Sequence, residues 1–217
     1  MATKNFKLIV QYDGTDYCGW QIQKNQTTIQ GVLKDCVQKI TKEKNVNIIG
    51  SGRTDSGVHS LGQVVNFKSC TNMNALQMLK ALNAILPKDI KVSKSKIVDM
   101  SFNARFSAIK RFYLYKFLSR AAPPAILKNK VWHIRKKIDV LAMKKASKFL
   151  IGSHDFTSFR SLSCQALSAK KTIDNISFKI VDDIIEMRIE AKSFLQNQVR
   201  IIAGSLIKVG TNFWKPE

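Results

Sequence analysis

The chain has 217 residues, of which 36 are Lys or Arg and 15 are Asp or Glu, so its formal net charge is +21. It is 45% hydrophobic with only 10 Gly and 4 Pro, which excludes disordered and fibrous proteins. We expect no membrane helix, because no apolar run approaches ~18 residues, and no signal peptide at the start.

The excess of positive charge predicts a polyanionic partner, and nucleic acid is the commonest one. Lysine supplies most of this charge, and a bias toward Lys, Ile and Asn also arises in AT-rich genomes, so many lysines could simply be solvated surface. The eight arginines are better pointers, because a guanidinium binds phosphate bidentately and stacks on bases.

The four cysteines are scattered through the chain and form no CxxC pair. This pattern argues against a disulfide framework and against a zinc cluster, and it fits a reducing cytoplasm. The cysteines are Cys18, Cys36, Cys70 and Cys164.

The first half of the chain predicts the element order β-α-β-β-α-β. Short β-prone apolar runs predict the strands, and apolar residues at helical spacing predict the helices, the second of which is stopped by Pro87. The predicted strands cover residues 6–11, 46–49, 62–67 and 90–98, and the predicted helices cover 28–40 and 73–86.

The second half predicts the order β-α-β-β-α, with a further short strand at 131–134. Large side chains on both faces of strand 111–119 predict a central position in a sheet, with Phe112, Tyr115 and Phe117 in the core. The other predicted elements are strands 173–181 and 184–191 and helices 140–151 and 196–209. We therefore expect two related α/β halves, 1–105 and 106–217, sharing one sheet, the second half short of its last strand.

A glycine-rich loop at residues 50–57 contains one carboxylate with the potential for chemistry. Three glycines in eight residues let the backbone turn tightly and approach a ligand. Asp55 lies two residues after Arg53, and a neighbouring cation favours the ionised carboxylate that a nucleophile or general base requires. Taken alone, the loop is more typical of a structural turn with an Arg–Asp pair.

Other catalytic signatures are missing from the sequence. The three histidines, His59, His133 and His154, show no metal-ligand spacing, so we predict no metal site. The chain contains neither a G-x-S-x-G nucleophile elbow nor a G-x-x-x-x-G-K-[ST] phosphate loop, so no nucleotide cofactor is implied.

The segment GRTDSGVH at 52–59, followed by GQVV at 62–65, closely resembles the catalytic motif of the tRNA pseudouridine synthase A family. Four further parts of the chain resemble the family in the same order. They are YDGTDYCGWQ at 12–21, FNARFSA with RFYLY between 102 and 115, HDFTSFR at 154–160 and QVRIIAGSL at 198–206. Five ordered segments over nearly the whole chain make a chance similarity very improbable.

The resemblance implies an α+β pseudouridine synthase fold, with a mixed, mostly antiparallel central sheet flanked by helices in two pseudo-twofold related halves. It also implies an isomerase that converts uridine to pseudouridine at nucleotides 38 to 40 of the tRNA anticodon stem-loop. Substrate and product contain the same atoms, so no cofactor is needed. The family works as a homodimer on tRNA, and we expect a cytoplasmic protein.

Residue by residue, the resemblance implies that Asp55 is the essential carboxylate, which either attacks the ribose or removes a sugar proton. Tyr113 would pack on the target base, although alone it fits a core aromatic. Arg200 would approach the carboxylate together with Arg53, although alone it fits a solvated helix charge. Arg105 and Arg111 would bind the RNA backbone or support the cleft, which completes the set of expected substrate-binding residues.

One alternative function stays open. Family members usually continue past the segment that resembles 198–209 with a further helix and strand, so we expect the second half to be short of that strand. A non-catalytic tRNA-binding or folding protein could keep the same fold. The retained Asp55 favours the enzyme, because binding alone would not need a carboxylate in a basic cleft.

Overall fold

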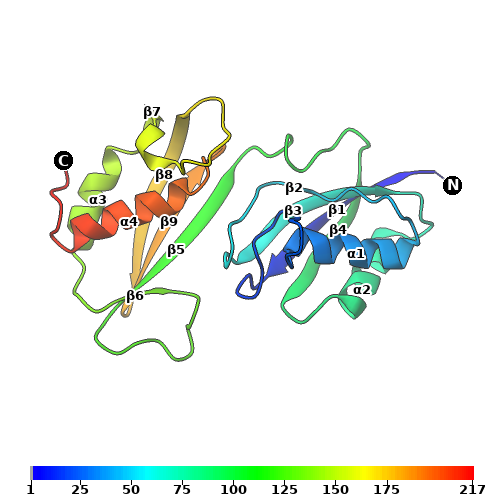
Figure 1. The fold of residues 1–217 in the computed structure, drawn as a ribbon, viewed down its shortest axis with the longest axis horizontal. Coiled ribbons are helices and arrows are strands. Elements are labelled where there is room, and N and C mark those ends of the chain that lie inside the picture. The colour runs from blue at the N-terminus through cyan, green and yellow to red at the C-terminus, as the bar shows by residue number, and fades with distance from the viewer. Residues whose placement is uncertain (1) are drawn as a thin grey trace. The chain divides into compact units, whose positions relative to one another are not determined.

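The computed structural model describes residues 2–217, which form two compact units divided between Ala108 and Ile109. Each unit contains its own sheet and its own hydrophobic core (Figure 1). The α+β class is confirmed. Within each unit the strands are hydrogen-bonded into one sheet.

The first unit contains a four-stranded antiparallel sheet in the order β2-β3-β1-β4. Its strands are β1 (Lys4–Tyr12), β2 (Ile49–Gly50), β3 (Ser60–Ser69) and β4 (Ile90–Val98). Along β1 the side chains of Phe6, Leu8 and Val10 are buried, as the period of two in a half-covered strand requires.

Two helices cover the apolar face of this sheet, α1 (Ile29–Thr41) and α2 (Ala75–Ile85) (Figure 1). The first begins at the Thr28 cap, whose side chain accepts a hydrogen bond from the Gly31 amide. The second begins at a reciprocal Asn74–Gln77 capping box, which satisfies two backbone donors. Their buried residues pack around the Phe6 and Phe67 rings, whose centroids are 5.3 Å apart.

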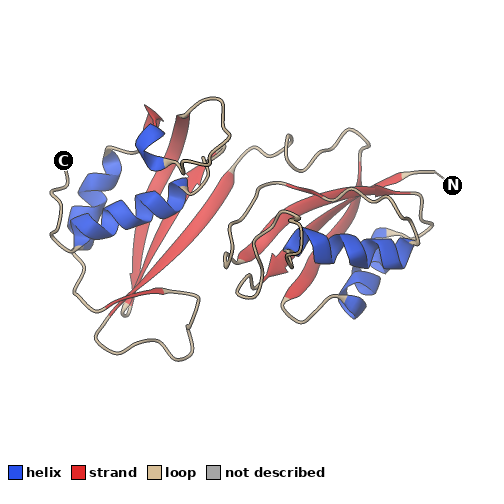
Figure 2. Ribbon diagram, in the orientation of Figure 1, coloured by secondary structure: helices blue, strands red, loops and turns tan. Residues whose placement is uncertain are grey.

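The second unit contains a five-stranded sheet in the order β6-β5-β9-β8-β7 (Figure 2). Among the described strands, β5 and β6 pair in parallel and all other neighbours pair antiparallel. The strands are β5 (Arg111–Ser119), β6 (Trp132–Ile134), β7 (Gly152–Asp155), β8 (Lys170–Val181) and β9 (Ile184–Ala191).

Helices α3 (Val140–Lys148) and α4 (Gln198–Gly210) pack on this sheet around buried Phe117, Met143 and Ile202. A short 3-10 turn, Thr157–Phe159, follows β7, and no strand follows α4 within the described residues. Each helix in residues 2–217 is too short or too polar to span a bilayer.

One core assignment from the sequence is wrong. Phe112 is 71% exposed, whereas Phe117 on the same strand is fully buried. The alternation along β5 places Tyr113, Tyr115 and Phe117 on the face that packs against the core, and Phe112 on the opposite face. The two helices therefore leave half of this central strand uncovered.

Candidate active site

Asp55 lies in the loop that connects β2 to β3, here called the Asp55 loop (residues 51–59). Its first residues are hydrogen-bonded to the adjacent strand. The amide of Ser51 donates to the carbonyl of Val64 over 2.8 Å, and the side-chain amide of Gln63 donates to the carbonyl of Gly52 over 2.5 Å. The start of the Asp55 loop is therefore held against β3.

A second loop, here called the clamp loop (residues 13–20), follows β1 and holds the Asp55 loop on both sides of the carboxylate. Before Asp55, the carbonyl of Thr54 accepts from the Trp20 amide over 2.9 Å, and its hydroxyl bonds to the Tyr12 phenol over 2.9 Å. After Asp55, the amide of Gly57 donates to the Tyr17 carbonyl over 3.3 Å. The half-buried Asp55 is thus held between two anchored residues.

Two glycines of the clamp loop allow this close approach of backbone to backbone. A Cβ atom at Gly14 would lie 2.1 Å from the Val58 carbonyl oxygen. A Cβ atom at Gly19 would lie 2.6 Å from the Thr54 carbonyl oxygen, and Gly19 also has a φ of +83°. Gly14 and Gly19 are therefore required for the close approach of the clamp loop to the Asp55 loop.

His59 and Asp13 connect the far end of the Asp55 loop to the clamp loop. The Nδ1 atom of His59 lies 2.9 Å from an Asp13 carboxylate oxygen and 3.1 Å from the Gly14 amide nitrogen. The same Asp13 oxygen accepts from the amide and the hydroxyl of Thr15 over 3.1 and 2.6 Å. The contact with Thr15 is the turn that the sequence indicates for this region.

Tyr17 anchors the clamp loop to the body of the unit. Its phenol donates to a carboxylate oxygen of Asp89 over 2.9 Å. Burial of the phenol, followed by the hydrogen bond and the negative charge of Asp89, raises the pKa of Tyr17 well above its ordinary value. The phenol therefore stays a hydrogen-bond donor throughout the physiological pH range.

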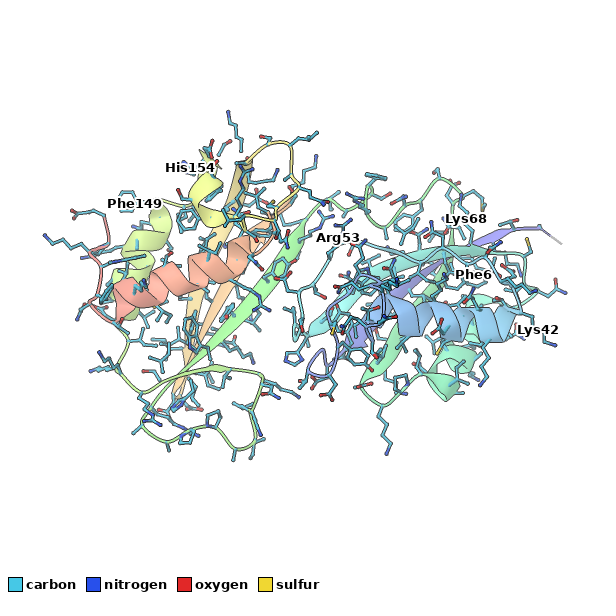
Figure 3. All side chains as sticks on the ribbon, viewed as in Figure 1. Phe6, Lys42, Arg53, Lys68, Phe149 and His154 are labelled. Carbon is cyan, nitrogen blue, oxygen red and sulfur yellow. The ribbon has the colours of Figure 1, made fainter. Side chains whose placement is uncertain are left out.

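The arginines of the first unit are both exposed. Arg53 lies on the Asp55 loop, two residues before the carboxylate (Figure 3). Arg105 lies in the segment after β4, with its guanidinium 5.5 Å from the Phe106 ring centroid.

The second unit places Arg111 and Tyr113 at one end of its sheet, where β5 begins and β9 ends. Arg111 is paired with Ala191 in the β5–β9 ladder, and its guanidinium donates to the Lys192 carbonyl. Tyr113 is half-buried, and its ring meets the Phe194 ring edge-on at 5.2 Å. Phe194 lies in the turn that leads into α4, where Arg200 is exposed.

The predicted residues therefore form two groups, one in each unit. Asp55 and Arg53 share a loop in the first unit, where Arg105 follows β4; in the second unit Arg111 and Tyr113 lie on β5 and Arg200 lies on α4. Within residues 2–217, no group of three or more His, Cys, Asp or Glu side chains is arranged to hold a metal ion. The chemistry that these residues can supply is a carboxylate, an aromatic face and several cations.

Comparison with known proteins identifies the group to which the chain belongs. A family model described as tRNA pseudouridine synthase matches residues 8–107 and 146–217. The chain is 44% identical over 207 residues to the tRNA pseudouridine synthase A of Thermoanaerobacter sp. (strain X514), covering 95% of this chain and 84% of that protein. It is 42% identical to the tRNA pseudouridine synthase A 2 of Clostridium tetani, covering 99% and 87%.

The tRNA pseudouridine synthase A of Sinorhizobium medicae is 43% identical, with 98% of this chain and 87% of that protein covered. The family model includes the Asp55 loop, the clamp loop and α4. The chain therefore belongs to the tRNA pseudouridine synthase family.

Proposed function

We propose that this chain isomerises uridine to pseudouridine at nucleotides 38 to 40 of the tRNA anticodon stem-loop, with Asp55 as the essential carboxylate. Membership of the family supports a tRNA pseudouridine synthase, which is an isomerase. The observation that carries the residue assignment is the double anchoring of the Asp55 loop, through Thr54 and Gly57, to the clamp loop. A carboxylate that must reach one ribose atom needs such fixed backbone on both sides.

The reaction is balanced without a redox partner. The N1–C1′ bond breaks, the uracil rotates, and C5 forms the new bond to C1′, after which C5 loses its proton to water and N1 gains one. Asp55 can either attack C1′ and form a covalent intermediate, or remove a sugar proton to give a glycal. Both routes require the carboxylate in its ionised form.

The other predicted residues act on binding and orientation in this proposal. Tyr113 offers an aromatic face to the target base, which loses its stacking when it leaves the helix. Arg53, Arg105, Arg111 and Arg200 hold tRNA phosphates or support the cleft, in keeping with the net charge of +21. We further propose that the active form is a cytoplasmic homodimer that requires no cofactor.

The test uses unmodified tRNA transcripts labelled with tritium at C5 of uridine. We expect the protein to release tritium into water, because the C5 hydrogen is lost when C5 bonds to the ribose. Transcripts in which U38, U39 and U40 are replaced singly and together by C assign the position, and the triple replacement should abolish release. Tight binding without release would instead favour the non-catalytic tRNA-binding protein.

Replacement of the Tyr113 ring should slow the reaction. Base–aromatic stacking contributes roughly 1–3 kcal/mol, so Tyr113→Leu should lower the single-turnover rate by about tenfold or more, while Tyr113→Phe should keep most of the stacking. The measurement is tritium release at saturating enzyme. Tyr115→Leu is the control, since Tyr115 lies two residues along the same face of β5. Removing the Tyr115 ring should lower the thermal midpoint and leave the single-turnover rate unchanged. Equal rates for Tyr113→Leu and the unchanged protein would contradict the assignment.

A further inference from the structure

Two asparagines are buried on the face of the first sheet that the helices do not cover. Asn5 of β1 is 0% exposed and Asn66 of β3 is 1% exposed. Both alternate with Phe6 and Phe67, which point into the helix-covered core. A buried amide is costly unless its donors and acceptors are paired, so these two positions need an explanation.

Every amide hydrogen of this asparagine pair is used, and most of the bonds hold the segment after β4. The Asn5 amide donates to the carbonyls of Asp99 and Phe102 over 2.8 and 2.9 Å. The Asn66 amide donates to the Asn5 side-chain oxygen over 3.0 Å and to the Phe102 carbonyl over 3.3 Å. The Asn66 oxygen accepts from the Ala104 amide over 2.8 Å.

Hydrogen bonds within the segment after β4 also fix the backbone of residues 105–107. The side-chain oxygen of Asn103 accepts from the backbone amides of Arg105 and Phe106 over 3.0 and 3.3 Å. The carbonyl of Asn103 accepts from the Ser107 amide over 2.8 Å. The backbone at Arg105 and Phe106 is therefore fixed, through Asn103 and Ala104, to the buried asparagine pair.

This fixed backbone presents an aromatic ring to solvent. Phe106 is 79% exposed, and the Arg105 guanidinium lies 5.5 Å from its ring centroid. An ordered ring with a cation beside it can stack on a nucleic-acid base while the cation binds the adjacent phosphate. Hereafter, Arg105 and Phe106 are called the stacking pair.

The surrounding sheet face is basic, which favours RNA over a protein partner. Lys7 lies on the same face as the asparagines, with its ammonium 5.1 Å from the Phe102 ring centroid. The strand register places three more lysines on this face, namely Lys68, Lys94 and Lys96, opposite Asn5, Ile9 and Lys7 respectively. Such a field attracts a phosphate backbone toward the stacking pair.

We propose that the stacking pair is a tRNA contact, in which Phe106 stacks on an unpaired base and Arg105 binds an adjacent phosphate, and that Asn5 and Asn66 are its positioning residues. The proposal rests on the proposed function only in taking tRNA as the ligand. The proposed contact is tested by measuring the Kd for tRNA, so its test is separate from that of catalysis.

The first test separates the two contacts by their salt dependence. Phe106→Leu should weaken tRNA binding by about fivefold or more, since stacking is lost, and leave the slope of log Kd against log salt unchanged. Phe106→Trp should bind at least as well as the unchanged protein. Arg105→Gln should lower the slope by about 0.7 to 0.9, the change expected for one phosphate contact.

Phe213→Leu is the matched control, because Phe213 is 71% exposed and has the Lys208 ammonium 5.3 Å from its ring centroid. Its Kd should match that of the unchanged protein. An unchanged Kd in Phe106→Leu, or an equal loss in Phe106→Leu and Phe213→Leu, would overturn the proposal. If the Kd is unchanged and the oligomeric mass of Phe106→Leu differs from that of the unchanged protein, the ring is instead a protein contact.

The second test addresses the asparagine pair with a double-mutant cycle. Asn66→Leu should weaken tRNA binding because the segment that holds Phe106 is released. If Asn66 acts through the stacking pair, adding Phe106→Leu to Asn66→Leu should cause little further loss. Full additivity of the two losses, measured below the thermal midpoint of each variant, would leave Asn66 a merely structural residue and overturn its positioning role. A protein that binds tRNA in this pattern without releasing tritium would refute the enzyme and leave the contact standing.

Discussion

Asp55→Asn is expected to lower tritium release by about a hundred- to ten-thousandfold, the range for loss of a group that takes part in bond making or proton transfer. The amide keeps the size of the carboxylate and its place in the loop, but it can neither attack C1′ nor remove a sugar proton. Binding of tRNA should persist, because one anionic group is removed from a surface that attracts phosphates. The measurements are single-turnover release and Kd.

Asp16→Asn controls for the change in net charge. Asp16 is an exposed acid in the clamp loop, which is hydrogen-bonded to the Asp55 loop. Its replacement changes the charge of the same unit by the same amount. Its release rate should equal that of the unchanged protein. Turnover that survives in Asp55→Asn would assign the chemistry to another group and refute the mechanism proposed above.

Gly19→Ala is expected to reduce both stability and turnover. The left-handed backbone at Gly19 alone costs an alanine about 1–2 kcal/mol. The new Cβ would also lie 2.6 Å from the Thr54 carbonyl oxygen and 3.0 Å from the Asp55 carbonyl carbon, so the loops must separate beside the carboxylate. Urea unfolding reports the stability, and tritium release reports the position of Asp55.

Gly57→Ala is a matched control for the backbone cost. Gly57 also has a left-handed φ, +75°, but its Cβ would meet nothing within 4 Å. The two variants should therefore share the loss of about 1–2 kcal/mol, and Gly19→Ala should show a larger loss of turnover. If Gly57→Ala were the more damaging of the two, the contact between the two loops would not be what holds Asp55.

Alternating or regularly spaced apolar residues were sufficient to predict most of the fold. Strands 90–98, 111–119 and 184–191 have the predicted bounds. β7 was missed because its sequence, GSHD, is polar, and only its ladder with β8 makes it a strand. β2 is shorter and later than predicted, because Val46 and Ile48 are buried in the core without joining the ladder.

In the candidate site too, contacts between residues distant in sequence could not be predicted. The motif singled out Asp55, but the hydrogen bonds that hold its loop come from Tyr12, Tyr17 and Trp20, which are distant in sequence. Nothing in the pattern around Asn5 or Asn66 distinguishes a buried amide from an exposed one. The sequence likewise does not show that Phe106 is exposed, since exposure of a large aromatic depends on which surfaces the fold leaves uncovered.

Trp20 makes the clamp between the two loops visible to fluorescence. Its indole is 3% exposed and lies against Gly50, where a Cβ atom would come within 2.6 Å of the ring. The other two tryptophans, Trp132 and Trp214, are 40% and 46% exposed, so a soluble quencher reaches them first. The emission that survives quenching comes from Trp20, whose backbone amide donates to the Thr54 carbonyl. It therefore reports, without any added label, whether the Asp55 loop is bound to the clamp loop.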